Sequence, residues 1–228
     1  LVGSEMCIRD SIDPNFPFVK TDNIQKIASK VTLLAQETLS DTLALLEHDN
    51  LQKALRIMQK ANQIHLAAIS YSLLLGQIFK LDMLRIGKNV NICNTNGEEL
   101  FLPAVIKNND CIIIISYSGE IHNLCSLART LKGRSVPIIA ITSLGDNELK
   151  KYADVVLHIS TREKLYSKIA GYSNENSIKL ILDILYSCYF NLMYDDNLAR
   201  RIAISKQAEV GRESTLEIMK EDNTQSGT

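Results

Sequence analysis

The chain has almost no net charge and no long apolar run. Its 25 Lys and Arg residues are balanced by 26 Asp and Glu residues, which leaves a formal charge of -1. A protein that holds DNA needs an excess of basic side chains to neutralise phosphates, so this chain by itself is not expected to bind DNA. The most apolar stretch near the end, Leu180 to Met193, falls short of the ~18 to 20 residues that span a bilayer. It is interrupted by Asp183 and Asn191, so it predicts a buried helix and no membrane partner.

The five cysteines form no CxxC pair, and no group of His, Cys or carboxylate residues has the spacing of metal ligands. Several cysteines lie in apolar runs, where a reduced thiol behaves as a small hydrophobic group. We therefore expect a protein of the reducing cytoplasm, with no metal and no cofactor. With 46% hydrophobic and 22% charged residues, the composition is that of a folded domain, and neither disorder nor a fibrous repeat is expected.

Residues 1–11 read LVGSEMCIRDS and lack both the basic start and the apolar core of a secretion signal. They resemble a translated sequencing-adapter artefact, so we interpret them as a non-native leader and expect natural residues upstream of Ile12 to be missing. The rest divides into connecting helices over 12–61, an α/β domain over 62–196, and a C-terminal helix and tail over 197–228. The polar end, Glu221 to Thr228, is expected to fray.

Apolar residues recur first at helical spacing and then in short runs rich in Ile and Val. The helical spacing predicts connecting helices from Thr21 to Leu46 and from Asn50 to Ala61. The short runs alternate with helical patterns, which predicts βα units and a parallel sheet covered on both faces. Five strands are predicted: Ile64 to Ala68, Val90 to Cys93, Cys111 to Ile115, Val136 to Ile141 and Val155 to Ile159.

Three helices are predicted between and after these strands. One runs from Ser72 to Ile86 and one from Glu120 to Lys132, and each is followed by a glycine suited to a left-handed cap, Gly87 and Gly133 respectively. A long helix from about Ser177 to Tyr194 follows the last strand. The pattern is that of an open parallel sheet with helices on its faces.

Hydroxyl side chains follow three of the predicted strands: Ser70 and Ser72, Ser116 and Ser118, and Thr142 and Ser143. Ligands of open parallel sheets bind beyond the carboxyl ends of the strands. Serine hydroxyls and free N–H groups at a helix start can bind a phosphate, and Gly119 lets the backbone turn tightly so that these donors converge. We therefore predict a small phosphorylated ligand such as a sugar phosphate.

A simpler interpretation is that each serine only caps the helix that follows it. For Ser72 this interpretation and the ligand-binding one both stay open. For Ser116 and Ser118 the ligand-binding interpretation is favoured, because two serines and a glycine exceed the needs of one cap.

Three segments resemble a known family. Residues 112–128, IIIISYSGEIHNLCSLA, resemble the hallmark strand, loop and helix of sugar isomerase (SIS) domains. Residues 67–90, AAISYSLLLGQIFKLDMLRIGKNV, and the later segments IIAITSLGDNELKKYADVVLHISTREKLYSKI and SIKLILDILYSCYFNLMY are similar to the SIS domains of MurR/RpiR-type transcription regulators. The similarity covers essentially Asp22 to Asn197. It implies an α/β SIS domain with a parallel, five-stranded, flavodoxin-like sheet flanked by helices and preceded by connecting helices.

The resemblance also implies a function and partners. In such regulators an N-terminal helix-turn-helix binds DNA, and the SIS domain senses a phosphosugar and forms a homodimer or tetramer. No helix-turn-helix is found in this chain, so DNA is an expected partner only through that missing domain.

Carried over residue by residue, the resemblance assigns ligand contacts to several positions. Ser72 matches the first-loop serine, Ser116 and Ser118 match the phosphate-loop serines, and Glu163 matches an acidic residue that faces the ligand. With the strand-end positions, the predicted ligand-binding residues are Ser70, Ser72, Ser116, Ser118, Gly119 and Glu163, and no catalytic residue is predicted. Ala68 and Ser70 stand where many members have glycines, and Ile121 replaces the usual threonine. An alternative for Glu163, a solvated acid beside Arg162 and Lys164, stays open.

Three functions are compatible with these residues. The first is a non-catalytic phosphosugar sensor that is part of a regulator. The second is an aldose-ketose isomerase, for which only Glu163 and His122 could supply the acid and base; His65 and His158 lie within strands and are interpreted as satisfied core residues. The third is a dimerisation module that has lost its ligand.

Overall fold

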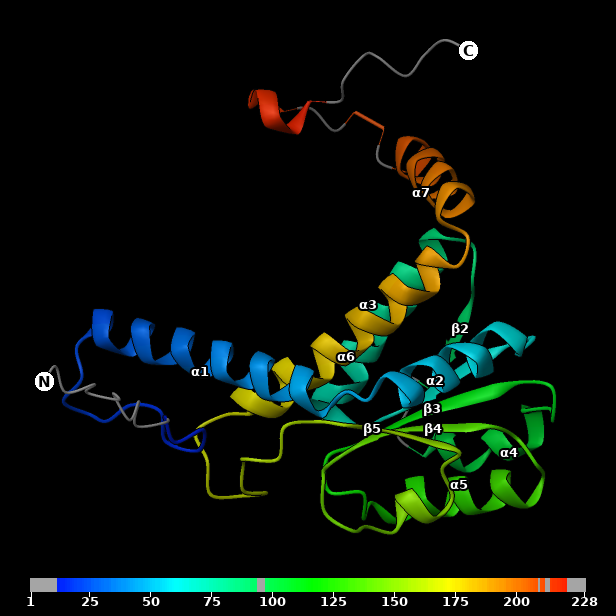
Figure 1. Cartoon of the computed structure of the whole chain (residues 1–228), viewed down its shortest axis with the longest axis horizontal. Coiled ribbons are helices and arrows are strands. Elements are labelled where there is room, and N and C mark those ends of the chain that lie inside the picture. The colour runs from blue at the N-terminus through cyan, green and yellow to red at the C-terminus, as the bar shows by residue number, and fades with distance from the viewer. Residues whose placement is uncertain (1–11, 94–96, 209, 212–213, 221–228) are drawn as a thin grey trace, which may run out of the picture.

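A five-stranded, all-parallel sheet with the order β2-β1-β3-β4-β5 forms the centre of the computed structural model (Figure 1), which describes residues 12–93, 97–208, 210–211 and 214–220. Its strands are β1 (Ile64–Ala67), β2 (Val90–Ile92), β3 (Cys111–Ser116), β4 (Ile138–Thr142) and β5 (Val155–His158). The predicted α/β fold and all five predicted strands are confirmed, with bounds that differ by two residues at most. The predicted leader, residues 1–11, and the predicted frayed end, Glu221 to Thr228, lie outside the described residues.

Helices cover both faces of the sheet. One face packs against α2 (His48–Lys60), α3 (Ser70–Arg85) and α6 (Tyr172–Asn191), and the other packs against α4 (Leu102–Val105) and α5 (His122–Gly133). Every residue of β3 is buried, as its run of consecutive apolar residues predicts for a strand covered on both sides. Burial of one Ile or Leu side chain stabilises the fold by about 1.5–3 kcal/mol.

The strand order reverses between β1 and β3. After β1 the chain passes to the edge strand β2, and it then returns to β3 on the other side of β1, where Ile64 pairs with Cys111 and Ala67 pairs with Ile114. In open α/β sheets such a reversal leaves a crevice beyond the carboxyl ends of the two strands, and ligands bind there. The fold therefore directs attention to the segments that follow β1 and β3.

Helix ends agree with the predicted glycine caps at one position and not at the other. Gly87 has φ +80° and follows α3, with the Lys88 N–H bonded to the Met83 carbonyl at 2.9 Å, as predicted. The prediction for Gly133 is wrong, because Gly133 is the last residue of α5 and Ser135 takes the left-handed conformation with φ +57°.

The contact between two buried side chains explains this shift. The Val136 N–H donates to the Leu131 carbonyl at 3.1 Å, and both side chains are buried in the same core cluster. Many left-handed helix caps have such a pair of hydrophobic residues, one inside the last turn and one just after the cap. The cap thus lies two residues beyond the glycine.

The helices outside the sheet layers are α1 (Ile24–Leu45) and α7 (Tyr194–Ala208); short 3-10 turns lie at Glu98–Leu100, Leu149–Lys151 and Glu217–Met219. Figure 1 shows α1 lying across the start of α6 and projecting from the body, and α7 turning away beyond the end of α6. The start of α6 lies five residues before the predicted Ser177. Its early start places Ser173 and Ser177 inside the helix.

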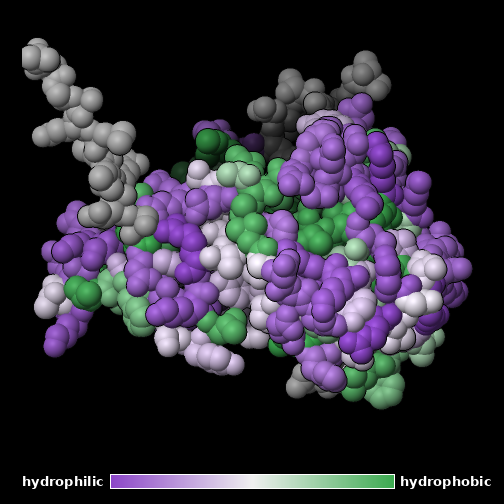
Figure 2. Space-filling view, turned by 60° about the horizontal axis from the view of Figure 1, so that its bottom comes forward, coloured by the Kyte–Doolittle hydropathy of each residue, from purple (hydrophilic) through white to green (hydrophobic). Residues whose placement is uncertain are grey.

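Hydrophilic side chains cover most of the face shown in Figure 2, and hydrophobic side chains occupy smaller areas between them. Among the described residues, no helix combines the length and the apolarity needed to cross a membrane.

Candidate functional site

The loop after β3 holds two serines whose oxygens are used by the loop itself. The Ser116 hydroxyl accepts a hydrogen bond from the Gly119 N–H at 3.1 Å, and the Ser118 hydroxyl accepts one from the Glu120 N–H at 3.2 Å. A serine hydroxyl that accepts a hydrogen bond still has its own O–H to donate. Among the described residues we find no acceptor for either hydroxyl hydrogen, so both donors remain for a ligand at the carboxyl end of β3.

Gly119 makes the sharp turn of this loop. Its φ is +68°, and a Cβ atom at this position would overlap the side chain of Asn147. The Gly119 carbonyl accepts from the Leu149 N–H at 3.0 Å and from the Cys125 thiol at 3.2 Å. The loop is thus packed against the segment after β4, and only glycine fits at this position.

Asn147 supports the loop and was not found from the sequence. Its amide donates to the Thr142 hydroxyl at 3.1 Å, and its side-chain oxygen accepts from the Lys150 N–H at 3.2 Å. Thr142 pairs with Ser116 across neighbouring strands. The only sequence signal was the pair of hydroxyl residues that ends β4, because the approach of Asn147 to Gly119 depends on the tertiary fold.

Neither α3 nor α5 is capped by a serine. The residues at their N-caps are Ile69 and Ile121, which have no hydrogen-bonding side chain, and Ser72 is the third residue of α3. The interpretation of these serines as simple helix caps is therefore wrong. The N–H groups at the start of α5 receive no capping side chain from Ile121, in keeping with a helix start that can bind an anion.

Ser70 is the first residue of α3 and has φ +55°. A non-glycine residue in this left-handed region is strained. The strain occurs at a position where the resemblance noted above implies a glycine. Ser70 is exposed and Ser72 is half-buried, and both follow β1 at the same edge of the sheet as the Ser116 loop.

Glu163 is buried, so the interpretation as a solvated acid is wrong. Its Oε1 accepts from the N–H groups of Ser173 and Asn174, the latter at 3.2 Å, and its Oε2 lies 2.7 Å from the Lys168 ammonium. Its side chain has no exposed surface. Oε1 is thus used at the start of α6, where a negative charge also complements the helix dipole, and Oε2 is used by Lys168.

Tyr117 joins the Ser116 loop to the segment that contains Glu163. Its hydroxyl donates to the Glu163 carbonyl at 2.6 Å and accepts from the Glu163 N–H at 3.0 Å. The Lys168 ammonium lies 5.5 Å from the centre of the Tyr117 ring, within cation–π range. Burial raises the pKa of Tyr117, so the hydroxyl keeps the proton that it donates. No sequence pattern indicated this role of Tyr117.

Three of the four histidines lie at different depths near the sheet, and the fourth, His48, is exposed at the start of α2. His122 is exposed and begins α5 directly after the loop. His158 is half-buried, and its Nδ1 lies 3.2 Å from the Ser143 carbonyl. His65 is buried in β1 as predicted, but neither of its ring nitrogens has a hydrogen-bond partner among the described residues. The prediction that it is a satisfied core residue is therefore only half right.

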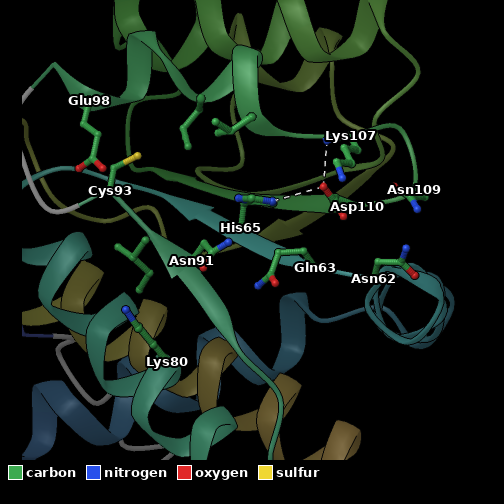
Figure 3. A pocket seen from close by; sticks show the side chains of 13 residues that line it. Asn62, Gln63, His65, Lys80, Asn91, Cys93, Glu98, Lys107, Asn109 and Asp110 are labelled. Carbon is green, nitrogen blue, oxygen red and sulfur yellow. Dashed lines mark hydrogen bonds and ion pairs between the residues drawn. The ribbon is translucent and has the colours of Figure 1, made fainter.

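A cavity of about 570 Å³ lies away from the serine loop, at the amino ends of β1 and β3 (Figure 3). His65 lies at its centre, with Nε2 3.6 Å from Asp110 Oδ2. Burial lowers the pKa of His65, and the Asp110 carboxylate opposes that shift in part. We place the candidate ligand site at the Ser116 loop and not here, because that loop lies beyond the carboxyl end of β3, beside the point where the strand order reverses. No three His, Cys, Asp or Glu side chains gather as metal ligands within the described part of the chain.

The reversed strand order and the serine loop after β3 define an α/β domain whose candidate ligand site lies at the carboxyl edge of its sheet. The sequence model of the SIS domain matches residues 57–186, more than half of the chain, and the chain belongs to the SIS domain family.

Solved structures with this fold include both regulators and enzymes. The NanR protein of Vibrio vulnificus, complexed with ManNAc-6P, has a TM-score of 0.73 and 17% identity over 81% of this chain and 71% of that chain. The sugar isomerase domain of an RpiR transcription factor from Sphaerobacter thermophilus has a TM-score of 0.70 and 16% identity, over 80% and 99% of the two chains. Phosphoheptose isomerase GmhA of Neisseria gonorrhoeae has a TM-score of 0.64 and 14% identity, over 74% and 100%. At these identities the likeness shows a shared fold.

Proposed function

We propose that this chain is the phosphosugar-sensing and dimerisation domain of a cytoplasmic transcription regulator of sugar metabolism. The observation that carries the proposal is the loop after β3, in which Gly119 turns the backbone and the hydroxyls of Ser116 and Ser118 keep their hydrogens for a ligand. A hydrogen bond to a charged oxygen contributes ~1.5–3 kcal/mol, so a few such bonds support micromolar binding. The complex of NanR with ManNAc-6P is one example of this fold with a sugar phosphate.

Within this proposal, Ser70, Ser72, Ser116, Ser118 and Gly119 form the ligand-binding segments. The proposed contact of Glu163 with the ligand requires its carboxylate to become accessible, since its side chain has no exposed surface and already binds Lys168 and the start of α6. We therefore assign the phosphate to the two serine loops and give Glu163 a supporting role.

A second candidate function is an aldose-ketose isomerase. It is favoured by the exposed His122, which begins α5 directly after the loop and could act as an acid or base. The engaged state of Glu163 leaves His122 without a second acid-base group among the predicted residues, which supports a sensor over an enzyme. A third candidate is a dimerisation module without ligand, which the departures at Ala68 and Ile121 keep open.

We propose that α3 forms the surface between two copies of the chain. Four large apolar side chains, Tyr71, Leu74, Ile78 and Leu81, are 42–63% exposed and recur at three- and four-residue steps along this helix. Residues at these steps share one helix face, and an exposed apolar stripe of this kind marks a protein contact. DNA would be bound by a helix-turn-helix joined to the amino end of α1, as in the regulators that the chain resembles.

The experiment is a thermal-shift screen of the purified chain with hexose, pentose and amino-sugar phosphates. A ligand at about 100 times its Kd should stabilise the protein by about 2.7 kcal/mol. An NMR spectrum of that ligand, incubated with protein, then shows whether aldose and ketose interconvert. Binding without conversion is the expected result. Conversion would establish the isomerase instead, and a screen without any shift would favour the dimerisation module.

A further inference from the structure

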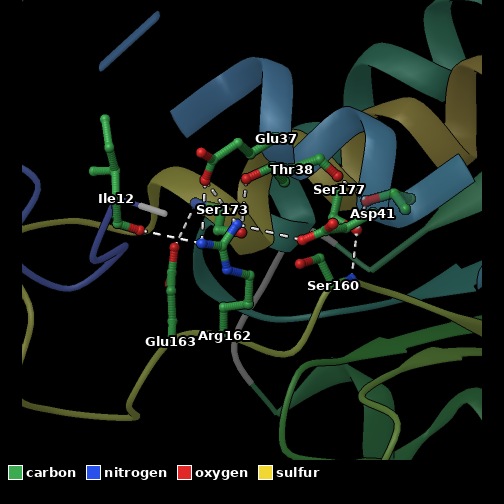
Figure 4. A network of polar contacts seen from close by, with 10 residues as sticks. Ile12, Glu37, Thr38, Asp41, Ser160, Arg162, Glu163, Ser173 and Ser177 are labelled. Atoms are coloured by element: carbon green, nitrogen blue, oxygen red, sulfur yellow. Dashed lines mark hydrogen bonds and ion pairs between the residues drawn. The ribbon is translucent and has the colours of Figure 1, made fainter. Parts of the chain in front are cut away.

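The contact between α1 and α6 is made through buried hydroxyl groups (Figure 4). Thr38 Oγ1 lies 2.9 Å from Ser173 Oγ, and Thr42 Oγ1 lies 2.7 Å from Ser177 Oγ, with all four residues fully buried. Apolar side chains are the usual content of a helix contact, because a buried polar group is costly unless it is hydrogen-bonded. These helices can therefore pack in this register only while the hydroxyls pair.

The direction of one of these hydrogen bonds follows from counting protons. Thr42 Oγ1 donates its hydrogen to the Thr38 carbonyl at 2.7 Å, so it must accept from Ser177. Ser177 Oγ in turn accepts from the Ser160 N–H at 2.9 Å, directly after β5. The hydrogen bonds therefore run in one direction, from the end of the sheet through α6 into α1.

The start of α6 also connects α1 to Glu163. The Ser173 N–H donates to the Glu163 carboxylate, while the Ser173 hydroxyl pairs with Thr38. Arg162, the neighbour of Glu163, makes a second contact with α1. Its guanidinium lies 3.2 Å from Glu37 and 3.3 Å from Asp41 (Figure 4). Two adjacent residues of the β5–α6 segment are thus linked to the same stretch of α1: Arg162 directly, and Glu163 through Ser173.

The Ser116–Ser118 loop contacts the same β5–α6 segment. Tyr117 lies between Ser116 and Ser118, and its hydroxyl forms both hydrogen bonds to the Glu163 backbone. The loop and α1 are therefore separated by only two intermediaries, Glu163 and Ser173. A partly broken buried network leaves unpaired polar groups, which is costly. Such a network therefore changes as a whole from one set of hydrogen bonds to another.

We infer that Tyr117 and Glu163 are positioning residues that make the packing of α1 on α6 depend on the state of the Ser116–Ser118 loop. A phosphate that draws the hydroxyls of Ser116 and Ser118 moves the backbone on both sides of Tyr117, and its hydroxyl then shifts the Glu163 segment. This inference rests on the proposed function. Under that function, α1 transmits ligand binding to the domain that is joined to its amino end.

The experiment compares amide hydrogen exchange of the whole chain with that of its Tyr117→Phe variant, both without ligand. The variant loses both hydrogen bonds to Glu163 and keeps the ring. Exchange in residues 34–45 of α1 should rise by about fivefold or more, the lower end of measured coupling between sites. Tyr152→Phe is the matched control, because its hydroxyl also takes part in hydrogen bonds, with Arg129 and Glu148, but lies outside this network. Equal α1 exchange in wild type and both variants would overturn the inference.

The reverse direction gives a second test if Tyr117→Phe does not fold. Thr42→Val keeps the shape of the side chain and removes the acceptor for Ser177, so exchange in loop residues 117–121 should rise by a similar factor. Thr42→Ser, which restores the hydroxyl, should return the loop to wild-type exchange. A loop unaffected by Thr42→Val would contradict the coupling.

A ligand arm separates this inference from the proposed function. Calorimetry with N-acetylmannosamine 6-phosphate reports binding, and exchange of residues 34–45 reports coupling. Binding that changes α1 exchange in wild type but not in Tyr117→Phe supports the inference. Binding that leaves α1 unchanged in wild type overturns it while the sensor proposal stands. An absence of binding to every sugar phosphate of the thermal-shift screen counts against the sensor proposal, and the ligand-free variants then decide the coupling.

Discussion

Gly119 and Asn147 are in such close contact that no side chain fits at residue 119. A Cβ atom there would overlap the Asn147 carboxamide, and the backbone at Gly119 has φ +68°. The loop that holds the two predicted phosphate-binding serines therefore keeps its shape only with glycine at this position.

Gly119→Ala is expected to weaken phosphosugar binding and to destabilise the fold by about 1–3 kcal/mol, because the new methyl group displaces Asn147 and strains the backbone. Urea denaturation measures the stability and calorimetry measures the binding. Gly145→Ala is the control, since a Cβ atom there meets no other atom within 4 Å and φ is not positive. Equal effects of the two variants would show that the contact with Asn147 has no role.

Ser118→Ala is expected to weaken phosphosugar binding by ~1.5–3 kcal/mol, because a charged acceptor loses a donor. Its fold should change little, since the Glu120 N–H that it binds is at an exposed part of the loop. Ser126→Ala, in the second turn of α5, is the matched control and should bind as wild type does. Unchanged affinity of Ser118→Ala in a calorimetric titration would remove Ser118 from the site.

Ser70→Gly is expected to stabilise the fold by about 0.5–1 kcal/mol, because glycine relieves the left-handed backbone and loses only part of that gain to entropy. Ser135→Gly, with φ +57°, should act in the same direction. Ser126→Gly inside α5 should do the opposite and destabilise by about 1 kcal/mol. Midpoints of urea denaturation compare the three variants, and a loss of stability in Ser70→Gly would mean that its side chain is needed for folding.

Glu163→Ala is expected to destabilise the fold by about 3 kcal/mol, because it leaves Lys168 and the start of α6 without their buried partner. Glu47→Ala, an exposed glutamate before α2, should have little effect. If instead Glu163→Ala keeps full stability and loses only ligand binding, Glu163 would be a ligand contact that the network around α6 does not require.

Acid is expected to destabilise the protein through His65. Burial holds the pKa of its imidazole below the ordinary value of 6.5, so the unfolded chain binds the proton more readily. The stability that the neutral form provides is present above pH 6.5 and is lost as the pH falls below that value, by about 1.4 kcal/mol for each unit of pKa difference. Denaturation between pH 5 and 8 should show a shallower decline in His65→Phe than in wild type. His48→Gln, at an exposed site, should follow wild type; an equal decline in His65→Phe would assign the effect to other groups, such as His158, whose pKa burial also lowers.

The sheet could be predicted from the sequence because consecutive apolar residues, as in the run from Ile112 to Ile115, leave few alternatives for a strand covered on both faces. The packing of α1 could not. Leu39 and Leu43 of this helix are exposed, whereas the polar Thr38 and Thr42 are buried. The reason is tertiary, because α6 presents Ser173 and Ser177 to that face.

The candidate site was predicted in the same uneven way. Ser116, Ser118 and Gly119 form one loop, as their succession after a strand indicated. The sequence could not show that Glu163 caps α6 or that Tyr117 binds its backbone. The first contact joins residues 11 positions apart across an irregular segment, and the second joins residues 46 positions apart. Local spacing carries no information about such pairs.

The reversal of strand order has a consequence for how the chain folds. Ile64 of β1 pairs with Cys111 of β3, so α3, β2 and α4 all lie within the loop that must close before the central pair forms. Closing such a loop costs chain entropy before any strand contact compensates for it, and proteins rich in such distant pairs fold slowly. The edge that holds the Ser116 loop can therefore form only once the loop between β1 and β3 has closed. A ribosome-bound chain that ends before β3 could pair β1 only with β2, so one apolar edge of β1 would stay open to pairing with other chains.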